Sequence, residues 1–139
     1  MIIADTGFWL ALFDGKDQFH DAARQALLSV REGLVTTWPV LTETCYLLQR
    51  QVGQAQAATF IERQTLGTFS LFALETHHLP RLTALMRQYA NLPMDLADAS
   101  LVVLAEHLGH GRILSTDQRD FDIYRWKNHH PFTNLLLMH

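Results

Sequence analysis

The sequence has little cysteine, no excess of basic residues and no long apolar run, and each shortage excludes a class of protein. Cys45 is the one cysteine among 139 residues, so neither a disulfide framework nor a cysteine-based zinc site can form. Lysines and arginines number 11 against 14 acidic residues, and a net charge of −3 gives no basic footprint of a duplex-DNA binder. No apolar run approaches the roughly 20 residues that cross a bilayer. A lone thiol suits a reducing cytosol, and we expect a cytoplasmic protein.

The sequence also lacks Pro/Gly/Ser-rich linkers, low-complexity tracts and internal repeats. Its length is that of one domain. With 48% apolar and 18% charged residues, the composition is typical of a globular chain and not of a disordered one. We therefore expect a single domain over residues 1–139.

Short apolar segments alternate with amphipathic ones along the chain. The apolar segments predict strands at 2–5, 34–37, 69–74 and 112–115, and an ambiguous last one in the tail at 132–138. The amphipathic segments predict helices at 6–13, 18–30, 39–53, 54–66, 76–89 and 95–108. Pro39 suits a first helical position and Thr76 an N-cap. The alternation predicts an α/β fold, with a mainly parallel sheet of four or five strands covered by helices on both faces.

Asp5 raises the first functional question because it stands between an apolar tripeptide and a run of aromatic and aliphatic residues. A buried carboxylate is costly unless it is paired, protonated or bound to metal. Asp5, Thr6 and Gly7 form the tripeptide of aspartic proteases, but such a protease needs an all-β body and this chain is mostly helical. In open parallel sheets the site lies at the carboxyl ends of the strands. An acid directly after the first strand therefore favours a metal site.

Three further acids lie in apolar surroundings, just after a predicted strand or in the first turns of a helix. Glu43 lies in WPVLTETCYLL, Asp98 in MDLADASLVVLAE, and Asp117 directly after RILST. The fold can gather them with Asp5 at one end of the sheet. Carboxylates in one pocket raise each other's pKa unless a cation neutralises them. Hard oxygen donors without cysteine suit Mg²⁺ or Mn²⁺, which can activate water for attack on a phosphodiester.

In this order the motifs ADTGFWLAL, VLTETCYLL, DLADASLVVLAE and LSTDQRDF resemble the PIN domain family, and within it the VapC-like toxin ribonucleases. The resemblance covers nearly the whole chain and implies a three-layer PIN-like fold. It implies a Mg²⁺- or Mn²⁺-dependent endoribonuclease, the toxin of a type II toxin–antitoxin pair, with Asp5, Glu43, Asp98 and Asp117 as catalytic metal ligands. The partners that it implies are an RNA substrate, a cognate antitoxin and a second copy of the chain.

Neighbouring acids leave two ligand assignments open. Asp95-x-x-Asp98 is also typical of a helix N-cap with an acid three residues later. We assign Asp98 as ligand and Asp95 as cap or auxiliary acid. Asp117 and Asp120 have the same spacing, and we assign Asp117, the nearer to its strand, as ligand and Asp120 as auxiliary.

The other two ligand positions have simpler alternatives. Asp5 is also explained as a turn former, and Glu43 as a solvated helix residue. Apolar flanks on both sides of Glu43 place it on the inner face of its helix, which favours a functional role. The resemblance further implies that Thr6 and Thr116 are small polar residues beside the site.

RNA binding requires cations, and a basic and aromatic segment follows Asp117. Arg119, Arg125 and Lys127 are the candidate phosphate contacts, and the ring residues between them suit base stacking. The alternative is that the rings are core and the charges a solvated rim. The apolar run at 9–13 is too dense for one helical face to bury, so part of it is a candidate dimer or partner surface.

Other functions compete with a nuclease. A non-cleaving PIN-like module would bind RNA or protein, although four intact acids argue against it. A receiver-like phosphoryl-transfer domain would need a lysine near its acceptor aspartate, and Lys16 and Lys127 are poorly placed. A histidine-based zinc site is disfavoured because His77 and His78 are adjacent in the sequence and do not share one helical face.

Overall fold

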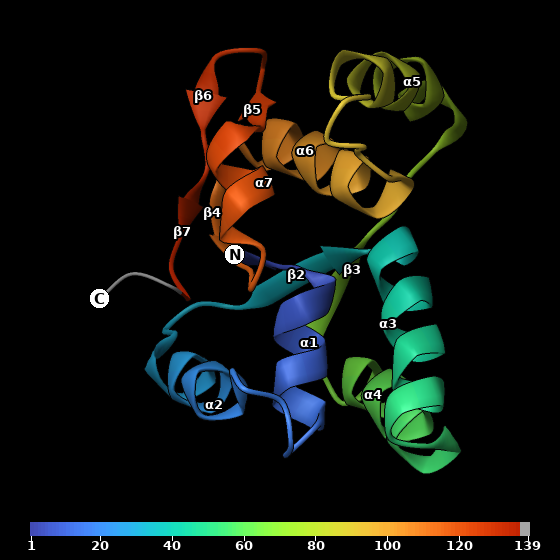
Figure 1. Ribbon diagram of the computed structural model, residues 1–139, viewed down its shortest axis with the longest axis vertical. Coiled ribbons are helices and arrows are strands. Elements are labelled where there is room, and N and C mark those ends of the chain that lie inside the picture. The colour runs from blue at the N-terminus through green and yellow to red at the C-terminus, as the bar shows by residue number, and fades with distance from the viewer. Residues whose placement is uncertain (137–139) are drawn as a thin grey trace.

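The computed structural model describes residues 1–136 and is built around a five-stranded sheet in the order β3-β2-β1-β4-β7 (Figure 1). The strands are β1 (Ile2–Ala4), β2 (Leu34–Thr37), β3 (Phe69–Phe72), β4 (Arg112–Leu114) and β7 (Thr133–Asn134). All neighbouring strands in this sheet are parallel. Two further short strands, β5 (Arg125–Trp126) and β6 (His130–Pro131), form a separate antiparallel hairpin. The predicted parallel α/β sheet of four or five strands is confirmed.

Helices cover both faces of the sheet. They are α1 (Thr6–Phe13), α2 (His20–Ser29), α3 (Trp38–Gln51), α4 (Gln54–Thr65), the 3₁₀ segment η1 (Thr76–His78), α5 (Leu79–Gln88), α6 (Leu96–Leu108) and α7 (Gln118–Ile123). Figure 1 shows α1 to α4 below the sheet and α5, α6 and α7 above it. The arrangement therefore has three layers, as the family resemblance implies. None of the helices described is long and apolar enough to cross a membrane.

The central strands are apolar because both of their faces are covered. Ile3 pairs in register with Val35 on one side and with Ile113 on the other. Ile3 and Ile113 are fully buried. The strands therefore form a rigid floor, and the loops at their carboxyl ends start from fixed positions.

Helix α1 contributes to the core most of the apolar run that the sequence left as a candidate partner surface. Trp9 is fully buried, with its ring 4.6 Å from that of Phe69 and 5.5 Å from that of Phe60. Leu10, Leu12 and Phe13 are half-buried and pack against the same core. The run is dense because α1 lies between the sheet and two neighbouring helices, α2 and α3, so it needs apolar residues on several sides.

Three local predictions need correction. The helix predicted from Thr76 begins as the 3₁₀ segment, and its N-cap is Glu75, which exchanges capping hydrogen bonds with His78. The tail has only the two-residue strand β7 within the predicted range 132–138, whose last two residues lie outside the described residues. The sequence reading also missed α7 and the β5–β6 hairpin, which follow Asp117.

The strand order places a switch in chain direction beside β1. From β1 the chain moves outward to β2 and β3, and then crosses back to β4 on the other side of β1. Ligands of open α/β sheets bind at such a switch point, outside the carboxyl ends of the strands. Asp5 follows β1 directly, and Asp117 comes three residues after the end of β4. These two acids therefore lie at the edge of the sheet where a site is expected.

Candidate active site

Asp5 is buried at the junction between β1 and α1. One carboxylate oxygen accepts the Thr6 N–H at 2.6 Å and so caps α1, and the other accepts the Ser115 hydroxyl at 2.8 Å. Burial is the largest of the causes that raise the pKa of Asp5 from its usual 3.8 to about 6; the charges of Asp117 and Glu43 act in the same direction, and the two hydrogen bonds act against it. Asp5 therefore caps α1 and also lies within the electrostatic reach of two other acids.

Ser115 joins the two strands of the switch point. Its buried hydroxyl donates to Asp5 and accepts the Asp117 N–H at 2.9 Å, so one side chain orients both acids. The Asn134 side chain in β7 holds the Ser115 backbone, accepting from its N–H at 3.2 Å and donating to its carbonyl at 2.8 Å. The predicted small polar residue on this side of the site was Thr116, and Ser115 was not predicted. Its position in the sequence could have identified Ser115 as a site residue, because it lies between the buried strand β4 and Asp117.

Thr116 has a packing role in the structure. Its hydroxyl lies against Gly7 in the first turn of α1, where an added Cβ would overlap it. Gly7 therefore has to lack a side chain so that the β4–α7 loop can approach α1. This close approach keeps Asp117 near Asp5.

The first turn of α6 contains the Asp95–Asp98 pair, and the two acids have different roles. Asp95 is the N-cap, and its carboxylate accepts the Asp98 N–H at 2.9 Å. Asp98 is partly buried and accepts the Tyr124 hydroxyl at 2.8 Å. Burial raises the pKa of Asp98 from its usual 3.8 to about 8, with further contributions from the charges of Asp5, Asp95 and Asp117. The structure thus gives Asp95 the predicted cap, and Asp98 faces the other acids.

Asp117 and Asp120 form a second pair of the same kind at the start of α7. Asp117 caps the helix and accepts the Asp120 N–H at 3.1 Å. Burial raises the pKa of Asp117, and the Asp120 charge adds to the effect. One carboxylate oxygen from each of Asp98, Asp117 and Asp120 lies within 4.8 Å of the others. Asp120, predicted as auxiliary, is therefore as close to this cluster as the two predicted ligands.

Glu43 approaches from α3 and is half-buried. Burial raises the pKa of its carboxyl, and the charge of Asp95 raises it further. The Thr6 hydroxyl acts in the opposite direction, yet Thr6 Oγ1 is buried and meets no partner at full hydrogen-bond geometry among the described residues. The structure therefore places Thr6 between Asp5 and Glu43 with an unsatisfied polar atom, and buried polar atoms ordinarily have a partner.

The structure brings two of the four predicted ligands, Asp98 and Asp117, into one cluster with Asp120. The charges of Asp117 and Glu43 act on the buried Asp5, and the charge of Asp95 acts on Glu43, so these two acids lie beside the cluster and not in it. The donors are carboxylate oxygens throughout, which suits a hard divalent cation such as Mg²⁺ or Mn²⁺. The raised pKa values are the expected result of several carboxylates in a shared, partly desolvated pocket, and a cation would relieve the repulsion.

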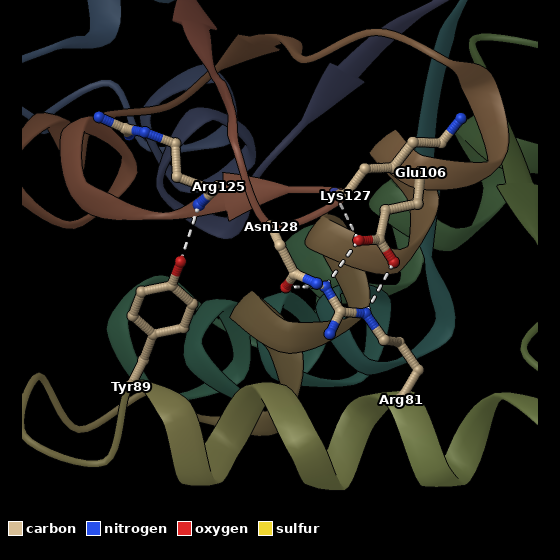
Figure 2. Close-up of polar contacts among 6 residues, drawn as sticks. All are labelled: Arg81, Tyr89, Glu106, Arg125, Lys127 and Asn128. Carbon is tan, nitrogen blue, oxygen red and sulfur yellow. Dashed lines mark hydrogen bonds and ion pairs between the residues drawn. The ribbon is translucent and has the colours of Figure 1, made fainter.

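Of the three basic residues predicted to contact RNA, the two arginines make polar side-chain contacts within the protein. Arg119 pairs with Asp120 at 3.3 Å and is exposed. The Arg125 guanidinium donates to the backbone carbonyls of residues 122, 123 and 124, so it closes the end of α7. Lys127 lies in the hairpin turn, where its N–H donates to Glu106 (Figure 2). Glu106 follows Asp98 by about two turns of α6, which is about 12 Å along the helix axis. The backbone contact of Lys127 therefore lies away from the acid cluster.

Tyr124, which comes directly after α7 and is fully buried, was not predicted as a site residue. From the sequence, the aromatic residues of this segment were candidates for core packing or for base stacking. No spacing signal connects Tyr124 with Asp98, because the contact depends on how α7 packs against α6. The sequence offers one indication, which is that a tyrosine with a polar hydroxyl follows the candidate acid Asp117 by seven residues.

The chain is similar to known proteins over most of its length. The chain is 27% identical to Ribonuclease VapC26 of Mycobacterium tuberculosis (strain ATCC 25618 / H37Rv) over 124 residues, 89% of this chain and 92% of the relative. The crystal structure of Mycobacterium tuberculosis VapC20, described as a Sarcin-Ricin loop cleaving toxin, superposes with a TM-score of 0.80 at 20% identity, covering 86% of this chain and 92% of that one. The PIN domain family model matches residues 2–127. The chain therefore belongs to the PIN domain family.

Proposed function

We propose that this protein is a Mg²⁺- or Mn²⁺-dependent endoribonuclease that hydrolyses phosphodiester bonds in RNA. The observation that carries the proposal is the oxygen cluster of Asp98, Asp117 and Asp120, beside the buried Asp5. A divalent cation bound there would neutralise the carboxylates, lower the pKa of water and stabilise charge on the phosphate. The similarity to a protein named a ribonuclease supports RNA as the substrate.

The residues of the chain have distinct tasks in this proposal. Asp98 and Asp117 hold the cation, with Asp120 beside them. Asp5 is kept in place by Ser115 and supplies negative charge from the floor of the site. Glu43 approaches the site from α3, and burial raises the pKa of its carboxyl, as expected for an acid that a bound cation would neutralise.

The test is RNA cleavage by the purified protein with Mn²⁺, with Mg²⁺ and with EDTA. Asp5→Asn, Asp98→Asn and Asp117→Asn should each reduce cleavage at least about 100-fold while the folded signal in circular dichroism persists. Asp122→Asn is the matched control, because Asp122 is an exposed acid of α7 outside the cluster. Full activity in any two of the three variants would contradict the proposal. RNA binding without metal-dependent cleavage would favour a non-cleaving binding module.

The proposal includes the biological setting of a type II toxin, with a cognate antitoxin as protein partner. Its support is the similarity to two VapC proteins. Co-expression with the protein encoded by the adjacent reading frame should yield a complex in which RNA cleavage is inhibited. A neighbouring protein that neither co-purifies nor inhibits cleavage would contradict the pairing.

A homodimer is also part of the proposal, through a surface different from the 9–13 run. Trp38, Tyr46, Leu79 and Leu96 are each about half exposed, and three of them line or flank an apolar groove of about 720 Å³ that reaches Glu43. Contiguous exposed apolar surface of this kind is typical of protein interfaces. Sedimentation at micromolar concentration should give a dimer for the wild type and a monomer for Trp38→Glu. Leu28→Glu, at an exposed leucine elsewhere, is the control and should stay dimeric.

A further inference from the structure

The phenol of Tyr124 contacts the acid cluster from the segment that leads into the β5–β6 hairpin. Tyr124 is fully buried, and its N–H donates to the Asp120 carbonyl at 3.0 Å, which closes α7. Its hydroxyl donates to Asp98 Oδ2 at 2.8 Å. A buried tyrosine hydroxyl needs a partner, but this one uses a carboxylate of the candidate cation site and not a backbone carbonyl. The contact therefore connects the end of α7 with the start of α6 through a proposed ligand.

Ring packing fixes the position of this phenol. The ring centroid of Tyr124 lies 5.1 Å from that of Tyr89 and 5.2 Å from that of Phe121, both in edge-to-face geometry. Tyr89 itself is held in place by its hydroxyl, which accepts the Arg125 N–H at 3.0 Å (Figure 2). Two aromatic walls from different helices therefore limit movement of the Tyr124 ring.

The hairpin that follows Tyr124 is also fastened. Glu106 accepts two hydrogen bonds from the Arg81 guanidinium, at 3.0 and 2.8 Å, and one from the Lys127 N–H at 2.6 Å. Asn128 accepts a further hydrogen bond from Arg81 at 3.1 Å. Figure 2 shows these contacts joining the hairpin turn to α5 and α6. The chain on the carboxyl side of Tyr124 is thus held against the same helix that carries Asp98.

A fixed donor has a specific effect on a carboxylate. The terminal torsion of aspartate is broad, so an unrestrained Asp98 would sample many orientations of its two oxygens. The Tyr124 hydrogen bond is the only side-chain hydrogen bond that Asp98 makes among residues 1–136. It fixes the direction of Oδ2 and so the plane of a carboxylate that has one oxygen within 4.8 Å of oxygens of Asp117 and Asp120. Groups that orient a metal ligand in this way raise the affinity of the site.

We propose, building on the function proposed above, that Tyr124 is a positioning residue for cation binding, whose phenol fixes the Asp98 carboxylate in the orientation that the site requires. Tyr124 does not touch the cation or the RNA in this proposal. Its removal acts through Asp98 alone.

Tyr124→Phe tests the proposal because it removes one hydroxyl and keeps the ring. The first readout is Mn²⁺ binding to the RNA-free protein, measured by electron paramagnetic resonance of free Mn²⁺. We expect Tyr124→Phe to bind Mn²⁺ at least about 10-fold more weakly, the loss typical when an orienting partner of a metal ligand is removed. Cleavage at saturating RNA should fall at sub-saturating Mn²⁺ and recover at high Mn²⁺, with the KM for RNA unchanged.

Tyr89→Phe is the matched control. It makes the same chemical change in the ring next to Tyr124, but its hydroxyl contacts the Arg125 backbone and no acid. We expect its Mn²⁺ affinity to stay within about twofold of the wild type. In an Asp98→Asn background, Tyr124→Phe should cause no further loss, because residues that act through one another are not additive.

Several results would overturn the proposal. Equal Mn²⁺ affinity in Tyr124→Phe and the wild type would refute it, as would equal losses in Tyr124→Phe and Tyr89→Phe, which would point to packing. A full additional loss in the Asp98→Asn background would show that Tyr124 does not act through Asp98. If the wild type itself does not bind Mn²⁺, the proposed function fails first, and the experiment separates the two failures.

Discussion

Asp98→Asn should stabilise the metal-free protein, and increasingly so as the pH rises from about 4 to about 8. The pKa of Asp98 is raised from 3.8 to about 8, mainly by burial. The folded protein therefore keeps a proton at Asp98 over a range of pH in which the unfolded chain has lost it. Unfolding releases that proton, so the free energy of unfolding falls as the pH rises from about 4 to about 8. Asparagine keeps the shape of the side chain without titrating and should remove this part of the pH dependence.

The size of the effect follows from the pKa of Asp98. One pKa unit corresponds to about 1.4 kcal/mol, so the change between pH 5 and pH 8 is at most about 4 kcal/mol. Solvent reaches part of the Asp98 carboxyl and screens its charge, and we therefore expect about 2 kcal/mol. For a domain of this length that is roughly 6 to 8 °C in melting temperature. At pH 5, only about one unit above the usual pKa of Asp98, the difference between the two melting temperatures should be much smaller than at pH 8.

The assay is a set of thermal melts of the wild type and Asp98→Asn at pH 5 and pH 8, in EDTA and in millimolar Mn²⁺. Mn²⁺ at about a hundred times its dissociation constant should stabilise the wild type by about 2.7 kcal/mol at pH 8. Asp98→Asn should start higher in EDTA and gain less than half of that from Mn²⁺. A stability difference that is the same at both pH values would refute the argument from burial of the charge. An unchanged Mn²⁺ shift would move the ligand assignment to Asp95.

Two further predictions concern the residues that hold the site together. Ser115→Ala removes the hydroxyl between Asp5 and Asp117 and leaves the buried Asp5 carboxylate without one of its donors. We expect the free energy of unfolding, measured by chemical denaturation, to fall by about 1 to 3 kcal/mol and the Mn²⁺ affinity to fall as well. An unchanged unfolding midpoint and Mn²⁺ affinity would contradict this prediction. Gly7→Ala should displace the β4–α7 loop at a cost of about 1 to 3 kcal/mol, since the new Cβ would overlap the Thr116 hydroxyl. Gly15→Ala, which meets no atom within 4 Å, is the control, and equal melting temperatures for the two alanine variants would contradict the packing argument.

Much of the architecture was predictable because local signals and tertiary packing agree. Short apolar strands alternate with amphipathic helices, and this pattern fixed the parallel sheet and six of the helical segments. The carboxyl-terminal part was not predictable in the same way. The hairpin turn has positive φ at Lys127 and Asn128 without a glycine, and contacts from Arg81 and Glu106 hold it. Residues far away in the sequence therefore hold this turn, and no local sequence motif predicts it.

The candidate site shows the same division. Acids that follow buried strands were identifiable because the ends of parallel strands meet at one edge, which accounts for Asp5 and Asp117. The pairing of Asp95 with Asp98 was readable as a helix cap. The contacts that orient these acids, from Ser115 and Tyr124, were missed because they join segments 26 and 110 residues apart in the chain. Which side chain orients an acid depends on the packing of helices and loops, which hydrophobic periodicity does not determine.

The central claim is that these carboxylates form one divalent-cation site. Anomalous diffraction from a crystal of the protein with bound Mn²⁺ tests it most directly, because the anomalous signal locates the ion without reference to activity. We predict a strong peak within coordination distance, about 2.0 to 2.6 Å, of oxygens from Asp98 and Asp117. A peak held by other residues, or no peak at this edge of the sheet at millimolar Mn²⁺, would contradict the account.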